Sequence, residues 1–239
     1  MGGYRTSTFW LTMAWLSLMR VAFATTMGTK MVVCAECGTT NTVHVITSTS
    51  SFGSMDLDSR PPSPARDNLK YQIQVCNKCR YSAIDISRPL TSNESKKYLL
   101  SIKQKKHSTL SDNYHIAAEL IQRETGNMLE AAFYDIRAAW VEDDCKNAHD
   151  RAKMFRRNAI AKLEQYMNSG GRMSPSMMMV LSDLYRRTGR FPDAETMAER
   201  VYIISGKKGF LADCAKLEIE NCQRFNSNRV HTGQSKGAN

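Results

Sequence analysis

Two short stretches decide the fold, Cys34-Ala-Glu-Cys37 and Cys76-Asn-Lys-Cys79, in each of which two residues separate a pair of cysteines. This spacing lets a tight turn direct both sulfurs at one ion, and two such turns supply the four thiolates of a closed tetrahedral site. We therefore predict that Cys34, Cys37, Cys76 and Cys79 bind one structural Zn²⁺ per chain. Four protein sulfurs leave no position for a catalytic water, so the pattern argues against catalytic zinc.

Strand-like sequence lies beside both cysteine pairs. Thr42-Val-His-Val-Ile46 follows the first pair, and Tyr71-Gln-Ile-Gln-Val75 precedes the second; both alternate or are rich in β-branched residues. Residues 31–91 are therefore predicted to form a small β zinc-ribbon-like module. The stretch between the two strands is much longer than in a minimal ribbon, but a long insertion adds little to the entropy of loop closure.

Two other interpretations of the cysteines are weaker. Four unrelated thiols would rarely fall into two such pairs, each beside a strand. A thioredoxin-like redox site has its pair at the start of a helix, and neither pair here opens a clear helical stripe. Thiolates that must stay reduced also indicate a reducing compartment.

The long insertion contains Phe52-Gly-Ser-Met-Asp-Leu-Asp-Ser-Arg60, and two interpretations of it remain. If the segment is extended, Asp56, Asp58 and Arg60 lie on one side and can hold a partner's charge or a second cation. Alternatively, the Ser, Gly and Pro residues make a turn-rich loop whose charges are solvated. The chemistry alone favours the solvated loop.

The period of the hydrophobic pattern changes from two to about 3.6 at Ser92 and stays there. Residues 92–225 are therefore predicted to be α-helical, with Ser92 or Asn93 capping the first helix. A run of lysines on this first helix is the strongest candidate for phosphate contacts: Lys96, Lys97, Lys103, Lys105 and Lys106. A solvated face is the more common meaning of such a run.

Two segments, residues 112–144 and 177–205, have the pattern of helical hairpins with a glycine turn. In the second, Gly189 separates two amphipathic helices, and small alanines stand where the helices must approach closely. This pattern resembles the tetratricopeptide repeat. The first hairpin is a degenerate copy, because Asp135 stands where the second has Ala198. The predicted fold class is thus a small β module followed by a mainly α, tetratricopeptide-like domain.

The rest of the hydrophobic pattern predicts two further helices that pack around these hairpins. A long helix is predicted over residues 146–168, between the two hairpins. A final apolar stripe predicts a helix that caps the stack: Phe210, Cys214, Leu217, Cys222 and Phe225. Residues 226–239 are rich in Ser, Asn and Gly and are predicted to be a flexible tail.

The composition is that of a folded globular protein. Among 239 residues, 42% are hydrophobic and 23% are charged, which excludes wholesale disorder and a polytopic membrane protein. The formal net charge of +10 is spread along the chain. The four thiolates and their zinc would leave no basic patch on the metal module.

Residues 1–30 are predicted to be an N-terminal extension. The apolar run over residues 9–19 is too short to cross a bilayer. It has signal-peptide form, with Arg5 before it and Ala22-Phe-Ala24 after it. Because the thiolates need a reducing environment, we favour translation from Met27 or Met31 and a cytoplasmic protein. Export, with residues 1–24 as a signal peptide, is the alternative.

Three motifs follow one another along the chain: the double cysteine module holding Ser51-Phe-Gly-Ser-Met-Asp-Leu-Asp-Ser-Arg-Pro61, then Arg137-Ala-Ala-Trp140, then Leu184-Tyr-Arg-Arg-x-Gly189. Together, over about residues 31–205, they resemble the bacterial family known as domain of unknown function 2225. The resemblance implies a zinc ribbon followed by tetratricopeptide-like helices, and it implies no reaction. It also implies a role beyond loop filling, as a partner-binding loop, for Phe52, Asp56, Asp58 and Arg60.

The leading functional hypothesis is a non-enzymatic interaction or scaffold protein whose stacked helices receive a protein or peptide partner. The sequence shows no nucleophile, base and orienting group at useful spacing, so an enzyme is not expected. A nucleic-acid-associated zinc-ribbon protein is an alternative, with affinity that falls steeply with salt. It would use the lysine run and the basic residues of the long helix: Arg151, Lys153, Arg156, Arg157 and Lys162. A redox-responsive zinc protein is a further alternative.

Overall fold

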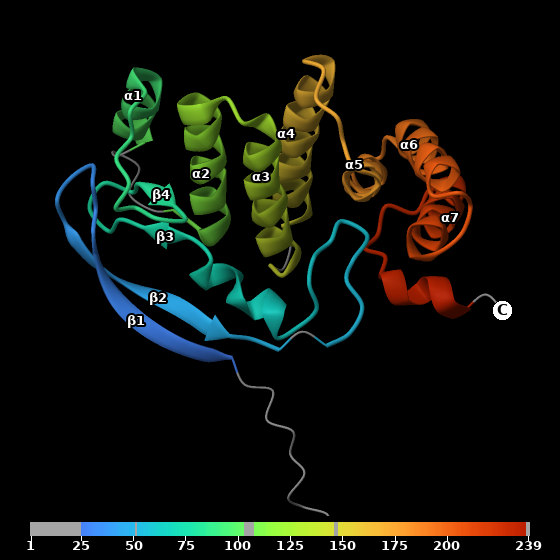
Figure 1. Ribbon diagram of the computed structural model, residues 1–239, viewed down its shortest axis with the longest axis horizontal. Helices are drawn as coiled ribbons and strands as arrows, with labels where there is room; N and C mark the ends of the chain where they lie inside the picture. Colours follow the sequence, from blue (N-terminus) through green and yellow to red (C-terminus); the bar gives the residue numbers. More distant parts are fainter. Residues whose placement is uncertain (1–24, 51, 103–107, 146–147, 238–239) are drawn as a thin grey trace, which may run out of the picture.

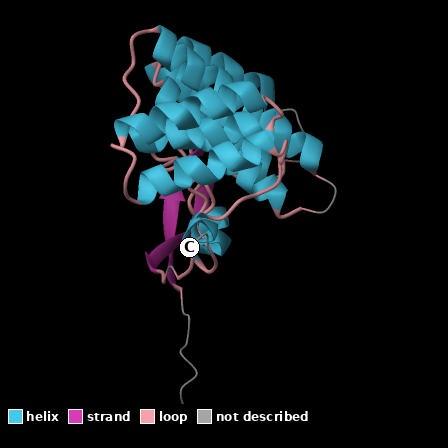
Figure 2. Cartoon of the chain, turned by 90° about the vertical axis from the view of Figure 1, so that its right-hand side faces the viewer, coloured by secondary structure: helices cyan, strands magenta, loops and turns pink. Residues whose placement is uncertain are grey.

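The computed structural model describes residues 25–50, 52–102, 108–145 and 148–237. Over these residues the chain is mostly helical, with two small antiparallel sheets that precede the helices in sequence. Figure 1 shows the strands on one side of the molecule and the helices arranged across its length. The view in Figure 2 shows the helices stacked together, with the strands at one end of the stack.

A long antiparallel hairpin carries the first cysteine pair. Strand β1 (Thr26–Val33) pairs with β2 (Thr40–Ser48), and the pair lies in the turn between them. Val32 and Val43 are buried, whereas most of their strand neighbours are exposed. The predicted strand after the first pair is therefore confirmed. Its partner strand begins at Thr26, within the segment that the sequence assigned to the N-terminal extension.

A shorter hairpin, of β3 (Gln74–Val75) and β4 (Ser82–Ala83), carries the second cysteine pair. The strand predicted over residues 71–75 is present only in its last two residues. Ahead of it lies a 3-10 helix, η1 (Ala65–Tyr71), which closes with a hydrogen bond from Gln72 N to Leu69 O (3.1 Å). This helical turn takes Tyr71 out of the strand ladder.

The first helices follow in the order that the hydrophobic period predicts. Helix α1 (Asn93–Ile102) is capped by the hydroxyl of Ser92, which accepts hydrogen bonds from two backbone N–H groups of the first turn. Helices α2 (Leu110–Thr125) and α3 (Met128–Asp143) form the first predicted hairpin. Between them, Gly126 adopts a φ of +68°, a left-handed conformation that favours glycine.

The remaining helices complete two packed groups. The predicted long helix, α4 (His149–Asn168), packs along α3. Helices α5 (Pro175–Arg187) and α6 (Phe191–Ile204) form the second predicted hairpin, and α7 (Phe210–Gln223) packs on α6. In Figure 1, α2, α3 and α4 stand side by side, and α5, α6 and α7 form the group at the other end. The two predicted hairpins are confirmed as helical hairpins.

Alanines allow these helices to approach closely, as the sequence predicts. Ten alanines of the described helices are fully buried: Ala118, Ala131, Ala132, Ala138, Ala139, Ala159, Ala194, Ala198, Ala212 and Ala215. Large side chains fill the space beside them, and the most deeply buried are Tyr114, Tyr134, Phe155, Leu163, Leu181 and Leu184. Because interiors pack as densely as organic crystals, this alternation of small and large residues sets the spacing of the helices.

The β module shares its core with the first helices. Leu99 and Ile102 of α1 and Ile116 and Leu120 of α2 are buried in one cluster with the strand and cysteine residues. The module residues of this cluster are Val32, Cys34, Val43, Cys76, Cys79, Tyr81, Ile86 and Leu90. The predicted boundary between residues 91 and 92 therefore runs through a continuous core.

The C-terminal residues differ from the predicted flexible tail. Leu57 N donates to Val230 O (3.1 Å), and Thr232 N donates to Met55 O (2.8 Å). Val230 is buried, and a 3-10 helix, η2 (Thr232–Gly237), follows it. The polar composition of this segment concealed its role, because its backbone rather than its side chains makes these hydrogen bonds.

A buried arginine holds the same segment from the helical side. The guanidinium of Arg186 is fully buried and donates to the carbonyl oxygens of Asn226 (2.6 Å) and Asn228 (2.7 Å). A buried charge needs such partners, because an unsatisfied one costs several kcal/mol. The segment after α7 is therefore part of the folded structure.

No helix among the described residues is both long enough and apolar enough to cross a membrane.

We predict that removal of residues 226–239 lowers the free energy of unfolding by about 3 kcal/mol or more, since it strips two acceptors from buried Arg186. Urea denaturation of the full and shortened chains measures the difference. The substitution Ser227→Ala, which changes an exposed side chain of the segment and leaves the backbone in place, should cost much less. Equal stability of the full and shortened chains would show that the segment is dispensable.

Candidate functional site

The four thiols of the two cysteine pairs meet in one cluster. The Sγ atoms of Cys34 and Cys79 are 3.6 Å apart, those of Cys37 and Cys76 are 3.5 Å apart, and all four lie within 4.8 Å of one another. Zinc–sulfur bonds of about 2.3 Å in a tetrahedron place the sulfurs roughly 3.8 Å apart, whereas a disulfide requires about 2.05 Å. The structure thus brings the predicted ligands together in an arrangement that can hold a metal ion.

Backbone hydrogen bonds shape the two cysteine turns alike. Gly38 N donates to Cys34 O (2.8 Å), and Arg80 N donates to Cys76 O (2.9 Å). Gly38 and Arg80 both adopt left-handed φ angles, of +69° and +66°. This conformation costs a non-glycine residue about 1–2 kcal/mol, so the second turn keeps its shape at some energetic expense.

Burial and hydrogen bonding shift the pKa values of the thiols in opposite directions. Burial raises the pKa of Cys34 to about 11. At Cys37, hydrogen bonds from Thr39 outweigh partial burial and lower the pKa to about 6. The amide Nδ2 of buried Asn41 lies 3.7 Å from the Cys76 sulfur. Four thiolates are therefore stable together only beside a cation, and metal binding would release protons.

A second cluster joins the three motifs that carry the family resemblance. The carboxylate Oδ2 of Asp58, in the loop before η1, accepts hydrogen bonds from Trp140 Nε1 (2.9 Å) and Arg187 Nη1 (3.1 Å). Trp140 lies in α3 and Arg187 at the end of α5, and all three side chains are buried. One carboxylate thus ties together three distant segments.

A neighbouring carboxylate, that of Asp143, extends this network. Its Oδ2 accepts from Arg156 (2.5 Å) and Arg187 (2.9 Å), and it lies 3.7 Å from Arg60 Nη1. Arg60 also pairs with Asp144. Burial alone would raise the pKa of Asp143, but the charges of Arg156 and Arg187 outweigh it and lower the pKa. The carboxylate therefore stays ionised inside the protein.

The third part of the network lies between α5 and α7. Fully buried Arg186 pairs with Asp183 and donates from Nε to Glu218 Oε1 (2.9 Å). Burial and the nearby charge of Asp183 raise the pKa of Glu218 to about 8. The contact between Arg186 and Glu218 holds α7 against α5, whereas Asp183 pairs with Arg186 within α5.

The solvated-loop interpretation of the long insertion is wrong. Asp56, Asp58 and Arg60 are only 2%, 1% and 0% exposed, because each forms ion pairs within the chain. For Asp56 these partners come from the C-terminal segment: Arg229 Nε lies at 3.5 Å and His231 Nδ1 at 2.6 Å. The sequence could not reveal partners that lie so far along the chain.

Of the four residues proposed for the partner-binding loop, Phe52 alone is exposed, with 59% of the residue's surface accessible. The charges of Asp56, Asp58 and Arg60 are directed inward and compensated. A partner that approaches this loop would therefore meet Phe52 and the exposed Met55.

The predicted phosphate contacts are only partly within the described residues. Lys96 and Lys97 are exposed on α1. Lys103, Lys105 and Lys106 lie outside the residues that the structure describes.

Helix α4 does not offer the continuous basic face that the nucleic-acid alternative requires. Arg156 and Lys162 are buried in ion pairs. Arg151 pairs with Glu142 (2.9 Å) and Asp112 (3.0 Å). These charges hold helices together, so they are not available to a ligand in the way the sequence suggested.

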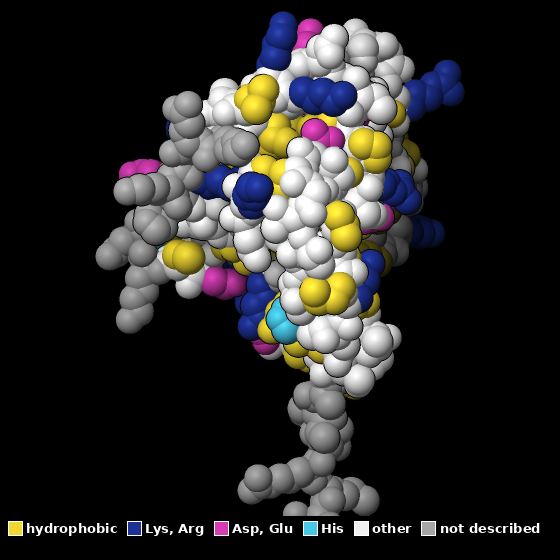
Figure 3. Space-filling model, turned by 90° about the vertical axis from the view of Figure 1, so that its left-hand side faces the viewer, with side chains coloured by type: hydrophobic (Ala, Val, Ile, Leu, Met, Phe, Trp, Pro, Cys, Tyr) yellow, Lys and Arg dark blue, Asp and Glu magenta, His cyan; other side chains and the backbone are white. Residues whose placement is uncertain are grey.

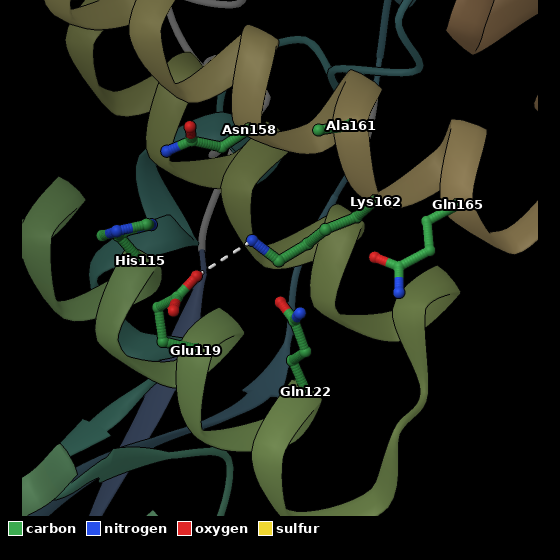
Figure 4. Close-up of a pocket in the computed structure, with 7 residues that line it drawn as sticks. All are labelled: His115, Glu119, Gln122, Asn158, Ala161, Lys162 and Gln165. Atoms are coloured by element: carbon green, nitrogen blue, oxygen red, sulfur yellow. Dashed lines mark hydrogen bonds and ion pairs between the residues drawn. The ribbon is translucent and has the colours of Figure 1, made fainter.

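A polar groove of about 380 Å³ lies between α2 and α4 (Figure 4). On its floor, Lys162 Nζ donates to Glu119 Oε1 (3.1 Å) and to Asp135 Oδ2 (2.8 Å). The other oxygen of Asp135 lies 2.7 Å from His115 Nδ1. Burial alone would lower the pKa of Lys162, but Asp135 outweighs it and raises the pKa. The groove therefore contains charges that neutralise one another.

Above this floor the groove presents hydrogen-bonding side chains. Gln122, Asn158 and Gln165 line its walls (Figure 4), and each amide offers both a donor and an acceptor. The Asp135–His115 pair orients an imidazole as a catalytic base is oriented. No hydroxyl or thiol is among the described lining residues, however, so the nucleophile of a triad is missing.

Sequence reasoning missed this groove, because its lining residues are spread over two helices and form no motif. The available signal was Asp135, an acidic residue at the position of small Ala198 in the second hairpin. Asp135 is fully buried and accepts from α2 and from α4, which explains the departure from the repeat pattern.

A family model described as an uncharacterized protein conserved in bacteria, domain of unknown function 2225, matches residues 27–218. This match confirms the resemblance drawn from the three motifs and extends it to β1 and most of α7. A search of the curated proteins finds no match, and a search of the solved structures finds none.

We predict that Asp58→Asn lowers the free energy of unfolding by about 3–5 kcal/mol, because it leaves the buried Arg187 guanidinium short of a counter-charge. Asp193→Asn is the matched control, since it removes a carboxylate from an exposed pair with Arg190 and should cost less than about 1 kcal/mol. Urea denaturation compares the two. A similar loss for both variants would contradict a central role for Asp58.

Proposed function

The chain belongs to the bacterial family known as domain of unknown function 2225, and we propose that it is a non-enzymatic interaction protein with structural zinc. In this proposal the metal stabilises the β module, and the helical hairpins are tetratricopeptide-like and receive a peptide or a protein. The observation that carries it is the closed cluster of four cysteine sulfurs.

The donor set supports zinc in a structural role. Soft thiolates favour zinc over magnesium or calcium, and four of them leave no open position for substrate. A filled site of this kind contributes roughly 10–16 kcal/mol of apparent folding free energy. Because the cysteines share a core with α1 and α2, that energy would stabilise the first helices as well.

The groove between α2 and α4 supports peptide binding. Its three amides can pair with the backbone N–H and C=O groups of an extended peptide. Its charged groups are already paired with one another, so recognition there would rest on hydrogen bonds more than on charge. Such a partner would bind without turnover.

We expect one zinc per chain in protein purified without added metal, measured by elemental analysis. Four thiols should become reactive only after chelation. Cys76→Ser should lose the zinc and lower the melting temperature, whereas Cys145→Ser, at an exposed cysteine outside the cluster, should change neither. Metal-free protein with oxidised cysteine pairs would refute the zinc site. Zinc release under mild peroxide would favour the redox-responsive alternative.

We predict that a photo-crosslinking amino acid at Gln165, on the groove wall, captures a discrete partner band in bacterial cells. The same amino acid at Glu199, exposed on α6 outside the groove, should not. Gel shift and mass spectrometry of the crosslinked product provide the measurement. Capture at Glu199 but not at Gln165 would place the binding surface elsewhere and reject the groove.

A further inference from the structure

A second hollow lies between the β module and the helices. It has a volume of about 520 Å³ and is lined by β1, β2, the end of η1, the loop after β4, and Arg137 of α3. A smaller hollow continues from it and shares His44, Tyr71 and Gln74 with it. Together they make one elongated groove, here called the hairpin groove. The side of the molecule with the β-hairpins is drawn in Figure 3, where Lys and Arg side chains lie among hydrophobic ones.

The hairpin groove has an excess of positive charge. Lys30, Lys70, Arg88 and Arg137 line it, and Asp85 is the acidic residue of its described lining. Asp85 pairs with Arg88 at 3.6 Å. Within the described part of the chain, no carboxylate forms an ion pair with the other three cations. On α4, by contrast, Arg151, Arg156 and Lys162 form such pairs.

Arg137 is the most informative of these cations. It belongs to the motif Arg137-Ala-Ala-Trp140, in which Trp140 is explained by its hydrogen bond to Asp58. The guanidinium of Arg137 is half-buried and lies over the Tyr134 ring, 5.5 Å from its centroid. A partly desolvated guanidinium without a carboxylate partner favours an anionic ligand.

Two aromatic rings, those of Tyr71 and His44, line the hairpin groove together with the cations. Tyr71 and His44 meet edge to face, with ring centroids 5.3 Å apart, and Lys70 Nζ lies 4.9 Å from the centre of the Tyr71 ring. Tyr71 is half-buried and His44 is exposed. Partly exposed aromatic rings beside basic side chains provide a stacking surface for a base next to contacts for its phosphates.

We propose that the hairpin groove binds single-stranded nucleic acid. Lys30, Lys70 and Arg137 contact the phosphates, and one base stacks on Tyr71. Only an unpaired strand fits this arrangement, because the faces of bases in a duplex are covered by their neighbours. The site goes beyond the proposed peptide function and uses a different surface. The sequence led us to expect no basic patch on the metal module. The hairpin groove is nevertheless basic, because Arg137 of α3 adds its charge to those of Lys30 and Lys70.

Fluorescence anisotropy of labelled twelve-nucleotide dT and U oligonucleotides with the zinc-loaded full chain provides the test. We expect binding whose log affinity falls with log salt concentration with a slope of about −2, as three phosphate contacts to a single strand imply. A duplex of the same length should bind several-fold more weakly.

Matched variants separate stacking from charge. Tyr71→Leu should weaken binding about tenfold with the slope unchanged, and Tyr71→Phe should retain it, because the ring is kept. Lys30→Gln with Arg137→Gln should reduce the steepness of the slope by about 1.4. Lys96→Gln with Lys97→Gln removes the same charge from exposed α1. The affinity and the slope of this variant should stay within twofold of those of the unsubstituted protein. Thermal unfolding checks that each variant is folded.

Three results would overturn the proposal. The first is no salt-dependent binding of either oligonucleotide at 50 mM salt. The second is an equal loss in the Lys96/Lys97 and the Lys30/Arg137 variants, which would show diffuse attraction to a basic protein. The third is binding of a twelve-residue polyglutamate as tight as that of dT, with no effect of Tyr71→Leu, which would indicate an acidic protein partner.

Discussion

The carboxylate of Asp58 is the contact on which the rest of the helical structure depends. It accepts from Trp140 and Arg187, and through Arg187 it is linked to Asp143, Arg156 and Arg60. Buried ion pairs contribute little net stability, but they penalise any arrangement that leaves one member unpaired. The network thus selects one arrangement of the loop, α3, α4 and α5. The three motifs that carry the family resemblance contribute Asp58, Trp140 and Arg187 to this network.

The cysteine cluster has the corresponding place in the β module. Most strand residues of the two hairpins are exposed or half-buried, so the strands bury little apolar surface, and small domains of this kind usually need a staple. The cluster lies where the hairpins, α1 and α2 share one core, so a bound metal would support both parts of the chain. The polar groove and the hairpin groove then lie on surfaces whose supporting elements are held rigid.

Local patterns predicted the local features well. The cysteine spacing indicated the cluster, the hydrophobic period indicated the helices, and the glycine turns at Gly126 and Gly189 indicated the hairpins. Contacts between residues that are far apart along the chain could not be predicted from the sequence. Composition made the loop at Asp58 look solvated, because its charges find partners far along the chain. The groove floor at Asp135 was missed for the same reason, although an acid at a small-residue position was the available signal.

The hydrogen bonds between the insertion and the C-terminal segment have a consequence for synthesis. Thr232 Oγ1 donates to the carbonyl of Met55, a residue 177 positions earlier in the chain. On the ribosome the insertion emerges long before its partners, whereas the cysteine turns and the first hairpin are complete early. The β module and α2–α3 can therefore form early during translation, but the segment around Asp56 reaches its final pairing only once residues 229–232 have emerged. For some time, nascent protein would carry this acidic loop exposed to chaperones and proteases.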